Sequence, residues 1–136
     1  VHGTILDASS LQLVTMKYLD PSSEKARLHI SAHEKELFPD ENTFLRYLKD
    51  DIGTASTSFV ICGFWYAEAL ITTGQIDKAY RIIENLICGS NHLSIFSEDI
   101  AQDGSQWGNF PQTYSHVGLI NTVCKLSQKL DNPLFL

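Results

Sequence analysis

Polar and aromatic side chains that could bind a ligand are concentrated in one stretch, residues 94–121. Glu98 and Asp99 follow a short apolar run there, and a glycine-marked turn separates them from Trp107. Gln112 and His116 lie four residues apart near the start of an expected helix, so they share one helix face. Carboxylate, indole, amide and imidazole groups in one stretch have the composition of a site for a polar ligand.

Glu98 is the candidate catalytic group of this stretch. The apolar residues before it are expected to anchor its backbone, while its side chain faces a cavity or the surface. A carboxylate held in this way can act as a general base, because it is ionised at neutral pH. The alternative is that Glu98 and Asp99 are two solvated acids on a loop.

Other residues could bind the ligand, and each has a structural alternative. Arg46, next to Tyr47, could donate its planar guanidinium to sugar hydroxyls or a carboxylate, or it could pack its stem on the surface. Gln112 and His116 could donate to a polyhydroxylated ligand, or they could form a hydrogen-bond network at the helix start. Trp107 could stack on a sugar ring. Trp65 could do the same, but its apolar segment is more typical of a core.

We expect neither a metal site nor a cofactor. His29, His33 and Glu36 have the spacing of one helix face, but the sequence adds no suitable further ligand. Glycine-rich phosphate loops and nucleophile elbows are absent from the sequence. The three cysteines are odd in number and widely spaced, which is typical of reduced core residues.

The composition is that of a single globular domain. The chain has 136 residues, of which 43% are hydrophobic and 19% charged, and its formal net charge is −6. This charge argues against a nucleic acid or an anionic membrane surface as partner. The longest apolar run, 59–67, ends at Glu68 and is shorter than the ~20 residues of a membrane span. We expect a cytoplasmic protein and, because the sequence begins at Val1 without Met, a piece of a longer chain.

Hydrophobic spacing predicts five helices, over residues 8–19, 22–37, 59–73, 76–87 and 111–130. Asp7 is the expected N-cap of the first helix, and Asn109 or Gly108 that of the last. Residues 38–57 are expected to form a long loop with a short strand, and loops of this length are often functional. Glu68 lies in the apolar third helix and should pair with an arginine or cap a neighbouring helix.

The spacing also predicts which face of each helix is buried. The second helix should bury Ala26, Ile30, His33 and Leu37, and the third should be buried on most sides. The inward residues of the fourth helix should be Ile76, Ala79, Tyr80, Ile83, Leu86 and Ile87. Those of the last helix should be Tyr114, Val117, Ile120 and Cys124. An all-apolar helix followed by a two-faced one indicates two layers, and therefore an all-α fold built from helical hairpins.

Several motifs carry a specific resemblance that runs from about Asp7 to the last helix. The succession RY–DD, SFVICGFWYAEAL, TGQIDKAYRIIENL, SEDI and GNFPQTYSHVGLIN resembles the C-terminal part of glycoside hydrolase family 15. This family contains glucoamylases, glucodextranases and bacterial trehalases. The resemblance implies an (α/α)6 barrel with six inner and six outer helices and an active site at one end. Residues 1–136 would then be a single segment from the C-terminal part of that catalytic domain, with about five of its helices.

The resemblance also assigns roles to residues. The family inverts the anomeric centre with two glutamates, and Glu98 matches the general base of its S-E motif. Arg46 matches the arginine that contacts the sugar in the innermost subsite. Asp99 departs from the commoner Gln or Glu at its position. The motif that holds the general acid in this family has no match in the chain.

These likenesses imply a hydrolase of α-glucosidic bonds, with an α-glucan or α-glucoside as substrate. We expect a glucoamylase-like enzyme that releases glucose. The alternatives are a trehalase of the same family and a non-catalytic scaffold or sensor domain, like the glucoamylase-like domains of phosphorylase kinase regulatory subunits. The isolated segment is expected to be inactive and to self-associate through unpaired apolar faces, with Phe59, Phe64, Trp65 and Ile120 as the candidates for exposure.

Overall fold

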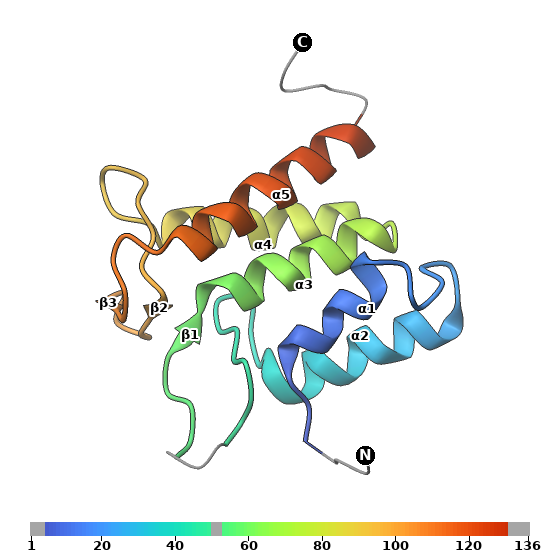
Figure 1. Cartoon of the computed structure of the whole chain (residues 1–136), viewed down its shortest axis with the longest axis horizontal. Helices are drawn as coiled ribbons and strands as arrows, with labels where there is room; N and C mark the ends of the chain where they lie inside the picture. Colours follow the sequence, from blue (N-terminus) through green and yellow to red (C-terminus); the bar gives the residue numbers. More distant parts are fainter. Residues whose placement is uncertain (1–4, 50–52, 131–136) are drawn as a thin grey trace.

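The computed structural model describes residues 5–49 and 53–130 and confirms the all-α class (Figure 1). Asp50 and Asp51, which belong to the family motifs, lie outside the described residues. The helices are η1 (Ala8–Leu11, a 3-10 helix), α1 (Gln12–Thr15), α2 (Glu24–Leu37), α3 (Val60–Thr72), α4 (Ile76–Cys88) and α5 (Thr113–Lys129). Three two-residue strands complete the described elements: β1 (Ser58–Phe59), β2 (Asp99–Ile100) and β3 (Gln106–Trp107).

Helix α3 is the centre of the fold. All its residues from Val60 to Ile71 are buried, as its all-apolar sequence predicts. Helices α4 and α5 pack against it, and η1 and α1 cover another side (Figure 1). Within the described part of the chain, none of the helices combines the length and apolar character that crossing a bilayer requires.

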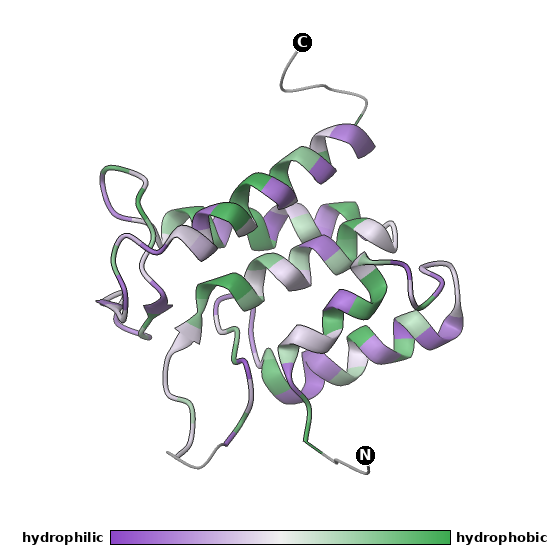
Figure 2. Ribbon diagram, viewed as in Figure 1, coloured by the Kyte–Doolittle hydropathy of each residue, from purple (hydrophilic) through white to green (hydrophobic). Residues whose placement is uncertain are grey.

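Helix α2 is an outer helix attached to the N-terminal turns. Its buried residues are Ala26, Ile30, His33 and Leu37, which confirms the predicted stripe, and Figure 2 shows hydrophilic colouring along much of its length. Ser23 caps it by accepting a hydrogen bond from the Ala26 amide at 3.1 Å. His33 Nε2 lies 2.7 Å from Ser10 Oγ, and His29 Nε2 lies 2.9 Å from the Ser10 carbonyl oxygen. These histidines therefore join α2 to η1, and the described residues hold no group of three metal-binding side chains.

The first helical segment is shorter than predicted. Asp7 is its N-cap, as expected, and accepts a hydrogen bond from the Ser9 amide at 2.8 Å. The helix ends at Thr15, four residues before the predicted end at Leu19. Lys17 has a φ of 59°, so the chain leaves the right-handed helical region there.

The predicted inner face of α4 is partly wrong. Tyr80 and Ile87 are exposed, and the buried residues are Ala79, Ile82, Ile83 and Leu86. A Cβ built on Gly63 of α3 would lie only 2.7 Å from Leu86 Cδ2. The glycine thus lets α4 approach α3 closely, and this contact selects which of the apolar residues of α4 face inward.

The predicted inner face of α5 is wrong. Tyr114, Val117 and Ile120 are 51%, 43% and 59% exposed, and Cys124 is half-buried. The buried residues are mostly small: Ser115, Gly118, Thr122, Leu126 and Ser127. A Cβ on Gly118 would lie 2.6 Å from Ile61 Cδ1, so α5 approaches α3 through its small residues and turns its larger apolar ones outward. The helix also starts later than predicted, with Gln112 as its N-cap in place of Asn109 or Gly108.

Two of the four residues predicted to be exposed are buried. Phe64 lies in the core, where its ring packs at 5.7 Å from that of Phe96. Trp65 is buried and packs at 6.0 Å from the ring of Tyr114, which supports its structural interpretation. Ile120 is exposed, which agrees with this second expectation and not with its assignment to the inner face of α5. Helix α3 is therefore buried by the described elements alone.

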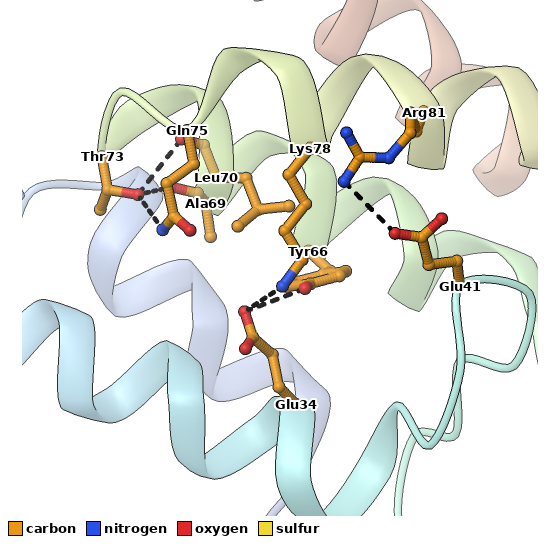
Figure 3. A network of polar contacts seen from close by, with 9 residues as sticks. All are labelled: Glu34, Glu41, Tyr66, Ala69, Leu70, Thr73, Gln75, Lys78 and Arg81. Carbon is orange, nitrogen blue, oxygen red and sulfur yellow. Dashed lines mark hydrogen bonds and ion pairs between the residues drawn. The ribbon is translucent and has the colours of Figure 1, made fainter.

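A polar network ties three helices together (Figure 3). Glu34 of α2 accepts hydrogen bonds from Tyr66 Oη of α3 at 2.9 Å and Lys78 Nζ of α4 at 3.1 Å. Lys78 also lies over the Tyr66 ring, 5.6 Å from its centre. Burial and the neighbouring Glu34 charge raise the pKa of Tyr66 well above its usual value, so the phenol stays a donor.

Candidate active site

A small antiparallel sheet sits at the N-terminal end of α3. Strand β1 pairs with β2 through Phe59 opposite Asp99, and β2 pairs with β3 through Asp99 opposite Trp107. The long loop before β1 holds an isolated antiparallel bridge between Lys49 and Thr54, where a short strand was expected. The sheet therefore brings the loop before α3 against the segment that carries the two acids (Figure 1).

The backbone of Glu98 is fixed from two sides. Its carbonyl oxygen accepts a hydrogen bond from the Val60 amide, the first of α3, at 3.1 Å. Its amide donates to the Asn109 carbonyl oxygen at 3.0 Å. Phe96, two residues earlier, is buried in the core. The acid is thus attached to the most buried helix of the fold, as a catalytic group requires.

The Glu98 side chain is half-buried and hydrogen-bonded. Its Oε2 accepts from the Asn109 backbone amide at 3.1 Å and from Asn109 Nδ2 at 2.9 Å. These bonds hold the carboxylate without removing it from water, which suits a group that works in the ionised form.

Glu98 and Arg46 both line one pocket of about 430 Å³. This volume lies within the usual range for small-molecule sites, roughly 300–1,000 Å³. The pocket is lined by both acids, Arg46, Tyr47, Phe59 and the loop residues 53–57. The structure therefore brings together a carboxylate and a guanidinium that are far apart in the sequence.

Arg46 is positioned by the N-terminal segment. Its carbonyl oxygen accepts from the Ala8 amide at 2.8 Å, and its Nε lies 3.4 Å from Asp7 Oδ2. Burial opposes ionisation of Asp7, but hydrogen bonds from Ser9 and the Arg46 charge outweigh it and lower the pKa of the carboxyl. The Arg46 side chain remains 46% exposed and lines the pocket, so it is accessible to a ligand there.

Asp99 has a different environment from Glu98. Its Oδ1 accepts a hydrogen bond from Thr57 Oγ1 at 3.2 Å. Burial raises the pKa of Asp99, and the nearby Glu98 charge adds to the effect, while the Thr57 bond partly opposes both. Asp99 therefore borders the pocket as the acid that gains a proton more readily than an ordinary aspartate.

Three predicted site residues lie outside the pocket lining: Trp107, Gln112 and His116. Trp107 is exposed and donates from Nε1 to Ser105 Oγ at 2.8 Å. Gln112 caps α5 through its side chain. His116 Nδ1 lies 2.8 Å from the Gln112 carbonyl oxygen, and Nε2 accepts from the Phe96 amide at 3.4 Å. His116 thus links the start of α5 to the segment that precedes β2.

Sequence reasoning missed several residues of the site. Thr57 and its loop neighbours line the pocket, and their signal was the hydroxyl-rich run TASTS inside an unusually long loop. Asn109 is the side-chain partner of Glu98, and it was considered only as a helix cap. Its place inside the GNFPQ motif was the available signal.

The curated relatives of the chain are trehalases. A trehalase from Thermoplasma volcanium is 37% identical over 92% of the chain, and one from Mycobacterium tuberculosis is 35% identical over 87%. A trehalase from Thermoplasma acidophilum is 35% identical over 90% of the chain. The chain spans about a fifth of the length of these relatives. No family model matches the sequence, and no solved structure matches it.

The described helices pack against one another as expected for part of a helical barrel, and Glu98 and Arg46 line one pocket beside the start of α3. The chain belongs to glycoside hydrolase family 15, as its motifs imply, and the relatives described above are trehalases.

Proposed function

We propose that this chain is the part of a trehalase that carries the catalytic base. The observation that supports it best is the identity of 34–37% to four trehalases over about nine-tenths of the chain. This favours trehalase over the glucoamylase-like activity that was first expected. The substrate would be a disaccharide of two glucose units joined through their anomeric carbons.

Glu98 is the base in this proposal. It accepts a proton from a water molecule as the water oxygen bonds to the anomeric carbon, and the bond from that carbon to the bridging oxygen breaks. A second carboxylic acid protonates the departing oxygen, and the configuration at the carbon inverts. In inverting enzymes the two carboxyl groups lie ~6.5–9.5 Å apart, which leaves room for the water. Asp99 is adjacent to Glu98 in the chain, so the acid comes from elsewhere in the parent protein.

Arg46 binds the sugar beside the base. Arg46 lines the same pocket, and its side chain is half-exposed. A planar guanidinium can donate to two hydroxyls at once. The hydroxyls of the loop 53–57 offer further hydrogen bonds on the same wall. A neutral, polyhydroxylated ligand suits this mixture of one cation, two acids and several hydroxyl groups.

The test is a paired kinetic measurement on the full-length parent protein with trehalose, maltose and dextrin. Glu98→Gln keeps the size of the side chain but cannot accept the proton, so kcat should fall ~10²–10⁴-fold with substrate binding retained. Asp99→Asn is the matched control and should have a much smaller effect. Retained activity in Glu98→Gln would refute the assignment of Glu98 as the catalytic base. Glucose release from dextrin but not from trehalose would refute the trehalase, and inactivity on all three would favour a non-catalytic domain.

A further inference from the structure

Asn109 is joined to Glu98 by three hydrogen bonds. Its backbone amide and its Nδ2 both donate to Glu98 Oε2, at 3.1 and 2.9 Å. Its carbonyl oxygen accepts from the Glu98 amide at 3.0 Å. One residue thus fixes both the backbone and the carboxylate of Glu98.

The hydrogen bonds fall on one oxygen of the carboxylate. Within residues 5–49 and 53–130, both bonds to the Glu98 side chain end at Oε2. A general base needs one oxygen free to take the proton and a fixed direction for its lone pair. Anchoring Oε2 leaves Oε1 for the attacking water.

Gly108 supplies the space for this arrangement. It has a φ of +78°, and a Cβ built on it would lie 2.7 Å from Glu98 Oε2 and 2.8 Å from Glu98 Cβ. Any side chain here would have to displace the carboxylate, because separations under 3.0 Å are sterically forbidden. Glycine also adopts this φ without the penalty that other residues incur.

We propose that Asn109 is a positioning residue that orients the carboxylate of the catalytic base through hydrogen bonds to its Oε2. Gly108 leaves the space that the carboxylate needs in this orientation. The inference rests on the proposed role of Glu98 as base. Asn109 does not contact the reacting atoms in this assignment, and its effect passes through the orientation of Glu98.

The first test is Asn109→Ala in the full-length protein. This variant removes the Nδ2 donor and keeps both backbone hydrogen bonds. We expect kcat on trehalose to fall about 10–100-fold, because a charge-assisted hydrogen bond and the alignment of the base are lost. KM should change little, since the residue lies outside the pocket lining. An unchanged kcat would overturn the proposal.

A double-mutant cycle separates positioning from general structural damage. If Asn109 acts through Glu98, Asn109→Ala should lower the residual kcat of Glu98→Gln no more than about twofold, because the base it aims is already gone. An equal loss in both backgrounds would show that Asn109 acts independently of Glu98 and would overturn the inference. If Glu98→Gln itself keeps full activity, the proposed function fails, and the two failures are therefore distinct.

Gly108→Ala has a matched control in the same segment. Gly104 has a similar φ of +81°, but a Cβ on it would meet nothing within 4 Å. Both substitutions carry the same kind of backbone strain, roughly 1–2 kcal/mol per residue, so both should lower the melting temperature, and Gly108→Ala should lower it further because of the clash with Glu98. Only Gly108→Ala pushes on the Glu98 carboxylate, so only this variant should lose kcat, by about tenfold or more. Equal kcat in the two variants would contradict the steric role of Gly108.

Discussion

Lys125 Nζ of α5 lies 3.0 Å from Glu68 Oε2 of α3, in an ion pair that joins the two helices. The Glu68 side chain is 11% exposed and that of Lys125 is 31% exposed. Glu68 was expected to need an arginine partner or a helix end to cap, and the structure supplies a lysine instead. The pair neutralises the acid within an otherwise apolar helix, and it fixes α5 along α3.

Removal of Lys125 should therefore destabilise the fold. Lys125→Met leaves a largely buried carboxylate without its partner, and we expect a loss of about 1–3 kcal/mol in the free energy of unfolding. Urea unfolding measures it. Lys129→Met, at an exposed position one turn further along the helix, is the control and should change stability by less than about 0.5 kcal/mol.

The double variant Glu68→Gln/Lys125→Met should regain part of the lost stability, because the unpaired charge is then absent. If Lys125→Met and Lys129→Met prove equally stable, the ion pair contributes nothing measurable.

The sequence predicted the elements of this fold well and some of their faces poorly. The stripe of α2 was correct because its four buried positions follow one helical period and most of its other positions are charged or polar. The face of α5 was wrong because burial there follows from backbone approach at Gly118, which a hydrophobicity pattern does not detect. Larger apolar residues such as Ile120 were assigned to the core, whereas the glycine face packs on α3.

In the candidate site, too, the sequence predicted some features and missed others. Glu98 and Arg46 could be found from the motifs that contain them, and the structure places both in one pocket. Thr57 and Asn109 could not be assigned their partners, because each contact joins segments that are distant in the chain. Pairing of β1 with β2, and the turn from β3 into α5, create these contacts. The local spacing of residues predicts neither the strand pairing nor this turn.

Arg46→Lys should lower kcat/KM on trehalose about tenfold or more in the full-length protein. The lysine keeps the charge but loses the planar pair of donors. The melting temperature should change little, because the ion pair with Asp7 is half-exposed on both sides and such pairs contribute ~0–1 kcal/mol. Asp7→Asn is the control and should affect the kinetics less than Arg46→Lys. Wild-type kinetics for Arg46→Lys would mean that the arginine is structural.

Asp99 should make the fold less stable as the pH rises. Burial raises its pKa above the ordinary value of 3.8, so the folded state binds the proton more tightly than the unfolded state. Its contribution to the free energy of unfolding therefore declines as the pH rises from 3.8 through the raised pKa. The asparagine in Asp99→Asn does not titrate. The stability of this variant relative to the unsubstituted chain should therefore increase as the pH rises from 3.8 through the raised pKa, as urea midpoints measured between pH 3 and about 7 would show.

Asp103→Asn provides the opposite sign as a control. The side-chain and backbone hydrogen bonds of Ser105 lower the pKa of Asp103, so this carboxyl stabilises the fold above pH 3.8 and loses that effect as the pH falls. The unsubstituted chain should then gain stability relative to Asp103→Asn as the pH rises. If stability depends on pH in the same way in the unsubstituted chain and in Asp99→Asn, the pKa of Asp99 is the same in the folded and unfolded states.

The outer face of α5 should drive self-association of the isolated 136-residue segment. Tyr114, Val117 and Ile120 are spaced three residues apart on this helix and are all exposed, so they form one apolar stripe. Sedimentation of the segment should show oligomers that dissociate on dilution. Ile120→Glu places a charge in the stripe and should shift the population to monomer. Leu28→Glu, which charges an exposed apolar position on the outer helix α2, is the matched control and should leave the oligomers in place. A segment that stays monomeric at every concentration and unfolds in one sharp transition would show that the stripe needs no partner.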